Sequence, residues 1–368
     1  MRRGLISWSR DEVPQATLEA RVERLQHAMK AAGLDAVVAY TSFAQPAPVQ
    51  WLTHFVPYWS EAVAVVLPQG APTLLAALTE RVHPWIREVS HLAEVISAPK
   101  LGAKAAAFLS ERVVGDVGKS DGNSVRIGVI GFDTLPWSVG GPLVDALGAD
   151  SLVDASALYA QLRQTADRAE LDLAKRATAI GEAALRAIPA GASRASEVLA
   201  AIEVSARRAG AEEVLLRIAA DFTRDATLRR MEGDAPLGER YAVELSVAYK
   251  GSWVRVNRCV AANGEPASWQ SAEQWLRQAA ASLTAAQTQP LNASAPGGGT
   301  LNAWTLEACT GVYPLSIVAA HDCAPVAALS AGGLAVLSVE LALADGPWRG
   351  SVPLALAAAG GHSTPLAS

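Results

Sequence analysis

The side chains best suited to move a proton in the second half of the chain are His321 and Glu340. His321 is one of only two histidines after residue 91, and an imidazole can act as a general acid or base near neutral pH. Glu340 lies in an apolar run, where an unpaired carboxylate is costly, so it needs a partner such as Arg255 or Arg258. We expect these two residues to form a catalytic pair. The alternative for Glu340 is a structural ion pair, and the alternative for His321 is a surface position beside Asp322.

A second group of polar residues lies on a predicted hairpin, whose strands are residues 242–249 and 253–260. Glu244 faces the side opposite its two apolar neighbours. Because Arg255 and Arg258 are three residues apart, they point to opposite faces of their strand unless a bulge intervenes. Only one of these two arginines can therefore face a pocket.

Cysteine chemistry is the less favoured alternative. Cys323 lies two residues after His321, but closeness in sequence does not provide hydrogen-bond geometry, and no third orienting group is visible. Cys259 and Cys309 are expected to be buried small hydrophobes. Three cysteines form no disulfide framework, and no CxxC or Cys/His cluster predicts zinc, so we expect a reducing cytoplasm.

Two further groups could border a pocket. One group could bind a charged small molecule at the mouth of the pocket, and the alternative is a solvated charged loop. It consists of Asp225, Arg229 and Arg230. Aromatic residues in the first half could cover the site of a second copy or pack in the core. These aromatic-cluster residues are Trp51, His54, Phe55, Tyr58 and Trp59.

The elements that position these residues form two halves. In the first half, a helix over residues 14–33 precedes short apolar strands that alternate with helices at 101–114 and 136–147, which predicts an α/β layer ending near Ser156. The strands are expected at residues 35–40, 61–68, 72–78, 94–99 and 126–132.

The second half begins with helices and continues with strands, which is typical of an α+β arrangement. One long helix is expected over residues 158–185. Further helices are expected at 196–210 and 271–287, a flexible loop at 295–302, and strands at 334–343 and 351–357.

Composition limits the function classes. With 368 residues, 51% hydrophobic residues, 18% charged residues and a net charge of -5, the chain is expected to form two domains and not to bind nucleic acid. The residues after Met1-Arg2-Arg3 lack the apolar run of a signal peptide or membrane anchor, so we expect no export and no membrane insertion.

Four motifs in order resemble the creatinase/aminopeptidase P/prolidase family: QWLTHF (50–55), the helical segment 162–213, the hairpin at 236–260 and LSAGGLAVLSVEL (329–341). The resemblance implies an α+β fold class, with an N-terminal creatinase-like α/β domain over residues 1–160 and a pita-bread domain over residues 161–368. In the pita-bread domain a curved antiparallel sheet is covered by helices. The resemblance also implies a homodimer in which the N-terminal domain of one chain shapes the site of the other.

The same resemblance implies that the metal chemistry of the peptidases is missing. Those enzymes hold two divalent ions with two Asp, one His and two Glu, because hard cations need anionic oxygen ligands. In this chain the Asp positions fall on Glu244 and Arg255, the His position near Thr310 and the last Glu position near Ser351, and only Glu340 is retained. We therefore expect no metal and no other cofactor.

The resemblance then favours a metal-independent hydrolase or lyase that acts on a C–N bond of a small polar nitrogen-containing molecule, similar to the creatine and ectoine hydrolases. His321 would be the acid/base, and Glu340 and Glu244 would orient substrate or water. Arg258, which matches a family arginine, would hold a substrate carboxylate. The residues expected to bind substrate are Arg258, Arg255, Asn257, Tyr313 and Trp59.

Two departures from the creatine hydrolases keep a second hypothesis open. Their base histidine position falls near Ala226, and Asn257 stands where they place an acid. The alternative is a catalytically inactive paralogue that acts as a ligand-binding or partner subunit.

The expected absence of metal gives a first prediction. Protein purified without chelators should contain less than one equivalent of manganese, cobalt or zinc per chain, because Arg255 places a positive charge where a bridging carboxylate would be needed. Elemental analysis measures this directly. Two equivalents per chain would show that the alignment of the ligand positions is incorrect.

Overall fold

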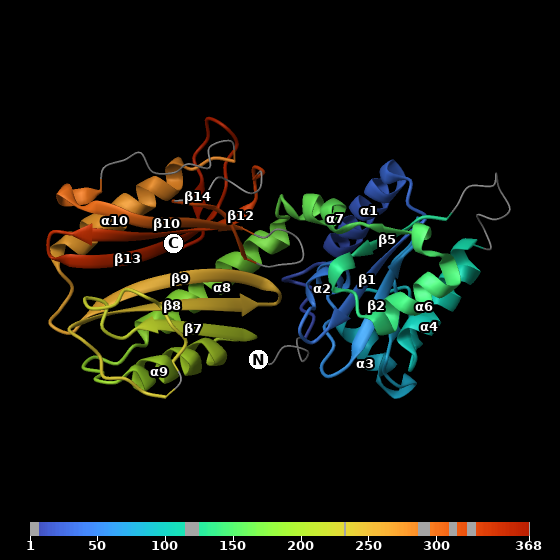
Figure 1. Ribbon diagram of the computed structural model, residues 1–368, viewed down its shortest axis with the longest axis horizontal. Coiled ribbons are helices and arrows are strands. Elements are labelled where there is room, and N and C mark those ends of the chain that lie inside the picture. Colours follow the sequence, from blue (N-terminus) through green and yellow to red (C-terminus); the bar gives the residue numbers. More distant parts are fainter. Residues whose placement is uncertain are drawn as a thin grey trace. The chain divides into compact units, whose positions relative to one another are not determined.

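The computed structural model describes residues 7–114, 125–231, 233–285, 295–308, 315–321 and 329–367. The chain divides into two compact units, and the boundary between their main bodies lies between Arg163 and Gln164. Figure 1 shows the first unit in blue to green and the second in green to red. None of the helices in these described ranges is both long enough and apolar enough to cross a membrane.

The first unit is built on a six-stranded mixed sheet with the order β4-β3-β2-β1-β5-β6. The strands β1, β2 and β3 are antiparallel neighbours, whereas β4, β5 and β6 join in parallel. Its strands are β1 (Ala36–Ser42), β2 (Glu61–Val66), β3 (Thr73–Ala76), β4 (Glu94–Ser97), β5 (Ile127–Ile130) and β6 (Leu152–Asp154).

Helices cover both faces of this sheet, which explains why its central strands are apolar on both sides. One core lies under α4 (Leu101–Leu109) and α6 (Trp137–Leu147). The other lies under α1 (Gln15–Ala32), α2 (Ala47–Thr53), α3 (His83–Val89) and α7 (Ser156–Arg163). The helix α1 ends at Gly33, whose left-handed conformation closes the last turn.

The second unit contains two antiparallel sheets, of three strands in the order β7-β8-β9 and of five strands in the order β11-β10-β12-β13-β14. The first sheet consists of β7 (Glu213–Ala219), β8 (Arg240–Tyr249) and β9 (Ser252–Ala261). The second consists of β10 (Thr300–Ala308), β11 (Ser316–Ala320), β12 (Leu334–Leu343), β13 (Gly346–Ala355) and β14 (Thr364–Pro365).

Three helices cover these sheets on one side (Figure 1). The three-stranded sheet packs against α8 (Arg168–Arg186) and α9 (Ala195–Arg208), and the five-stranded sheet packs against α10 (Ala267–Ser282). The predicted hairpin between β8 and β9 is present, and Lys250 and Gly251 both adopt positive φ in its two-residue turn.

The single helix expected over residues 158–185 is in fact two helices, α7 and α8, and this expectation was wrong. Asp167 accepts a hydrogen bond from the Glu170 backbone and begins α8 with a capping box. Between the helices, Ala166 and Thr165 donate hydrogen bonds to the carbonyls of Gly332 and Ala331. The break therefore ties the start of α8 to the turn before β12.

Five strands were not expected from the sequence: β6, β7, β10, β11 and β14. The loop expected at residues 295–302 is a short 3-10 turn, Pro296–Gly298, followed directly by the start of β10. The strand β10 was missed because it follows a run of glycines, and its apolar residues begin only after that run.

Side chains join the two sheets of the second unit where β9 lies beside β13. The Ser351 hydroxyl accepts a hydrogen bond from the Asn257 backbone N–H at 2.8 Å and donates to the Arg255 carbonyl at 3.3 Å. The Cys259 thiol bonds in the same way to the backbone N–H and carbonyl of Arg349, at 3.1 and 3.4 Å. Burial raises the pKa of this thiol to about 12, so it is unreactive at neutral pH.

This junction generates a stability prediction. Ser351→Ala should lower the free energy of unfolding by about 1–3 kcal/mol, because it leaves the backbone groups of Asn257 and Arg255 without their partner. Urea unfolding measures the change. Ser271→Ala, on the exposed surface of α10, is the matched control and should stay within about 0.5 kcal/mol of the parent. Equal effects of both substitutions would contradict the role of the junction.

Candidate functional site

A pocket of about 340 Å³ lies in the second unit between its two sheets. Residues of β7 to β13 line it, together with residues 226–228. Its charged lining consists of three arginines and three glutamates: Arg217, Glu244, Arg255, Glu307, Glu340 and Arg349. The volume is that of a site for a small molecule.

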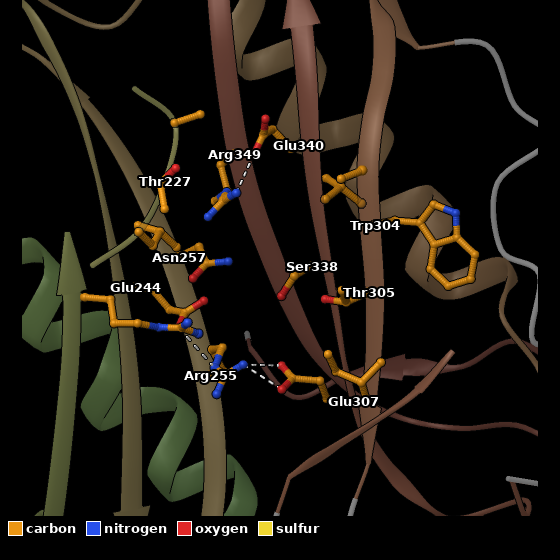
Figure 2. Close-up of a pocket in the computed structure, with 16 residues that line it drawn as sticks. Thr227, Glu244, Arg255, Asn257, Trp304, Thr305, Glu307, Ser338, Glu340 and Arg349 are labelled. Carbon is orange, nitrogen blue, oxygen red and sulfur yellow. Dashed lines mark hydrogen bonds and ion pairs between the residues drawn. The ribbon is translucent and has the colours of Figure 1, made fainter. Parts of the chain in front are cut away.

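Four of these charged side chains form a continuous row across the pocket (Figure 2). Arg217 donates from Nε to Glu244 Oε1 at 2.6 Å. Arg255 Nε lies 3.5 Å from the same Glu244 oxygen, and Arg255 Nη1 donates to both Glu307 oxygens, at 2.6 and 2.7 Å. Arg255 thus connects a carboxylate of the three-stranded sheet with a carboxylate of the five-stranded sheet.

The remaining pair is Glu340 with Arg349. The two residues are directly opposite each other on β12 and β13. The need of Glu340 for a partner in its apolar strand is met, but by Arg349 and not by either arginine of β9.

Burial governs the electrostatics of this row. The side chains of Glu244 and Glu307 are only 9% and 5% exposed. Burial raises the pKa of Glu307, and the Glu244 charge raises it further, whereas Arg255 opposes the shift. The guanidinium of Arg255 is therefore what keeps two buried carboxylates in one small volume.

Strand alternation brings these residues to one face. In the three-stranded sheet, Arg217 pairs with Glu244 and Glu244 with Asn257, so the three side chains form one cross-strand row. Asn257 lies two residues from Arg255 on β9 and faces the same way. Four residues predicted from the sequence, Glu244, Arg255, Asn257 and Glu340, thus line the same pocket.

Arg258 does not line this pocket, and Arg255 takes the place that was expected for it. The reason is the same alternation, because Arg258 lies on the face of β9 that α8 covers. It donates to the Leu185 carbonyl at 3.4 Å and to Glu265 at 3.0 Å.

His321 also does not line the pocket. It follows the last residue of β11, is exposed, and its backbone N–H donates to the Trp304 carbonyl at 3.1 Å. Its role as proton carrier stays a prediction. Five other residues named with the candidate site lie outside the described residues: Cys309, Thr310, Tyr313, Asp322 and Cys323.

The aromatic cluster belongs to the first unit. Trp51, His54 and Phe55 are buried there, as core packing requires. Trp59 is 70% exposed and makes an edge contact with Tyr58. Its role in substrate binding stays a prediction.

Asp225 and Arg229 form an exposed ion pair with an Nη1–Oδ2 distance of 2.5 Å. This hydrogen bond from Arg229 lowers the pKa of Asp225 to about 2. Neither residue lines the pocket, whereas their neighbours at 226–228 do.

Three charged residues of the pocket were missed in the sequence: Arg217, Glu307 and Arg349. Arg217 and Glu307 lie on β7 and β10, which were not predicted as strands. A usable signal for Glu307 was its position between Leu306 and Ala308 in an apolar run, which is costly for an unpaired carboxylate.

The described residues do not fit the metal-ligand set that the resemblance implies. Among residues that the structure describes, no three His, Cys, Asp or Glu side chains converge to form a metal site. Each pocket carboxylate is paired with an arginine, and Ser351 is bonded to the backbone of β9. We therefore derive no chemical step through a metal ion.

The charged row generates a prediction about stability and pH. Arg255→Leu should lower the free energy of unfolding by about 3–5 kcal/mol at pH 8, because two buried carboxylates lose the cation between them. The loss should be smaller at pH 5. Without Arg255 the folded-state pKa of Glu307 rises further above its unfolded value, so protonation at low pH stabilises the folded state.

Arg258→Leu is the control for this experiment, on the same strand but in a partly exposed pair. It should cost at most about 1 kcal/mol, with little dependence on pH. Urea unfolding of both variants at the two pH values measures the difference. A loss for Arg255→Leu that does not change with pH would contradict the electrostatic origin.

Comparisons with known proteins agree with this architecture. Residues 21–165 match the family model of the creatinase/prolidase N-terminal domain. No curated protein sequence matches the chain.

The solved structures that are similar extend over both units. Prolidase from Pyrococcus furiosus is 15% identical, with a TM-score of 0.64 over 94% of this chain and 98% of that one. X-Pro aminopeptidase from Thermotoga maritima is 16% identical, with a TM-score of 0.65 over 94% and 97%. Xaa-Pro dipeptidase from Bacillus anthracis is 17% identical, with a TM-score of 0.62 over 95% and 97%.

These comparisons confirm the resemblance and the expected α+β fold class, because the family model matches most of the first unit and the similar structures cover both. The chain carries the N-terminal domain of the creatinase/prolidase family and has the pita-bread fold of the prolidases.

Proposed function

We propose that the second unit is a metal-independent hydrolase or lyase that acts at a C–N bond of a small polar nitrogen-containing molecule. The observation that carries this proposal is the pocket itself, which combines three carboxylates and three guanidiniums in about 340 Å³. Carboxylates can orient water and move protons, and guanidiniums stabilise developing negative charge. The C–N bond is supported by the names of the similar structures, since prolidases and Xaa-Pro peptidases hydrolyse amides.

Metal independence is supported by the charges. A divalent ion placed between Glu244 and Glu307 would meet the guanidinium of Arg255, with Arg217 on the other side of Glu244. Like charges at such distances repel strongly in a partly buried site. The arginines already provide the positive charge that the carboxylates need.

Glu307 is the pocket residue best suited to carry a proton. Its carboxyl is nearly buried in the pocket beside Arg255, and burial raises its pKa. Glu244 and Glu340 remain the residues proposed to orient substrate or water. His321 is exposed and does not line the pocket, so it has no geometric support for the same role.

A second function is favoured by one observation: all three pocket carboxylates are engaged in ion pairs. A carboxylate held by an arginine is a weaker base than a free one. On this basis the second candidate is a ligand-binding or partner subunit without turnover.

The proposal retains a homodimer and a cytoplasmic location. The dimer is supported by Trp59, a large aromatic side chain that is 70% exposed on the first unit. Light scattering tests the oligomeric state.

Turnover assays distinguish the two functions. Guanidino compounds, small amides and Xaa-Pro dipeptides are incubated with the protein, with EDTA or with manganese. We expect turnover that EDTA does not change. Glu307→Gln keeps the shape of the side chain and should lower the rate by roughly 100-fold or more.

His321→Ala should leave the rate within about threefold, because the side chain is exposed and does not line the pocket. A loss of roughly 100-fold would instead restore His321 as the proton carrier. Turnover only with manganese would contradict metal independence. Ligand binding without any turnover would favour the second candidate.

A further inference from the structure

A row of uncharged polar side chains crosses the floor of the pocket. Thr305, Ser338 and Ser351 are direct cross-strand neighbours on β10, β12 and β13. The row continues onto β9, because the Ser351 hydroxyl accepts a hydrogen bond from the Asn257 N–H. Figure 2 shows Asn257, Ser338 and Thr305 between the Glu340–Arg349 pair above and the Arg255–Glu307 pair below.

Two oxygens of this row lack a hydrogen-bond partner within the described parts of the chain: Asn257 Oδ1 and Ser338 Oγ. Both atoms are shielded from solvent, and both residues line the pocket. A buried oxygen without a partner is unfavourable, so the site is suited to a ligand that supplies one.

The charges around the row balance. Three arginines and three glutamates line the pocket, and every carboxylate is paired with an arginine. A ligand with a net charge would lose its hydration without meeting an opposite net charge. It could bind strongly only by displacing an ion pair, which leaves a nearly buried partner such as Glu307 uncompensated.

We propose that this polar row makes the pocket selective for a net-neutral ligand with an amide or ureido group. An N–H of that group donates to Asn257 Oδ1, and Ser338 Oγ donates to its carbonyl. The inference rests on the proposed function, since it takes this pocket as the ligand site. The ligand fits between the two ion pairs, which are separated by four residues along β10, or about 13 Å.

Three probes of similar size and different charge test this selectivity: neutral N-acetylglycinamide, anionic N-acetylglycine and cationic glycylglycinamide. Binding is measured by calorimetry and by the shift of the unfolding temperature. The neutral probe should bind the parent protein at least about tenfold more tightly than either charged probe. Tighter binding of a charged probe, or no binding of the neutral one, would overturn the inference.

Variants of the row locate the binding. Ser338→Ala should weaken the binding of the neutral probe by about three- to tenfold, because one hydrogen bond is lost. Asn257→Asp gives the pocket a net negative charge and should reverse the preference, so that glycylglycinamide binds best. Asn302→Asp makes the same change at an exposed β10 residue that does not line the pocket, and should leave the parent preference.

The order of the three affinities is measured within one variant, so a loss of stability does not obscure the result. An unchanged order in Asn257→Asp would overturn the role of Asn257. Conversion of a charged substrate in the turnover assay, with weak neutral binding, would overturn this inference and leave the proposed hydrolase intact. If binding of the neutral probe depends on Asn257 and Ser338 but no compound is turned over, this inference stands and the proposed hydrolase activity is contradicted.

Discussion

The charged lining of the pocket in the second unit is organised around Arg255, whose side chain is 20% exposed. Arg255 projects from β9 toward the five-stranded sheet and lies between Glu244 and Glu307, which come from different sheets. Two carboxylates exposed by less than a tenth cannot both stay ionised in one small volume unless a positive charge compensates them. The guanidinium suits this task because its rigid fork donates to Glu307 and to Ser246 while its Nε lies 3.5 Å from Glu244. This contact joins the two sheets across the pocket, in addition to the Ser351 and Cys259 contacts where β9 lies beside β13.

The same contact changes what the fold can do. In a pocket where carboxylates face each other, a positive charge is needed, and here the chain provides it covalently. A covalent cation cannot exchange or acidify a water molecule as a bound metal ion does. Under the proposed function, the chemistry in this pocket relies on carboxyl protons, on guanidinium hydrogen bonds and on the neutral side chains between the ion pairs.

Much of the fold could be predicted because its signals are local. Apolar runs between turn residues identified β1 to β5, and Lys250-Gly251 identified the β8–β9 hairpin. Four pocket residues, Glu244, Arg255, Asn257 and Glu340, were predicted. Strand alternation indicated Glu244 and one of the two arginines of β9, and the family resemblance indicated Asn257 and Glu340. Their partners were not predicted. Which arginine neutralises Glu340 is decided by the pairing of β12 with β13, and no local pattern encodes that pairing.

The error over Arg258 shows where such reasoning stops. Alternation correctly required that only one of Arg255 and Arg258 face the pocket, but it cannot say which face of β9 the helix α8 covers. That choice is made by packing. Gly181 of α8 lies against Val256 so closely that a Cβ atom would come within 2.9 Å of it, which fixes the even-numbered face of β9 against the helix. Arg258 shares that face and reaches the Leu185 carbonyl, and Arg255 is left to face the second sheet. The close packing of Gly181 against Val256 thus belongs to the arrangement in which Arg255, and not Arg258, lines the pocket.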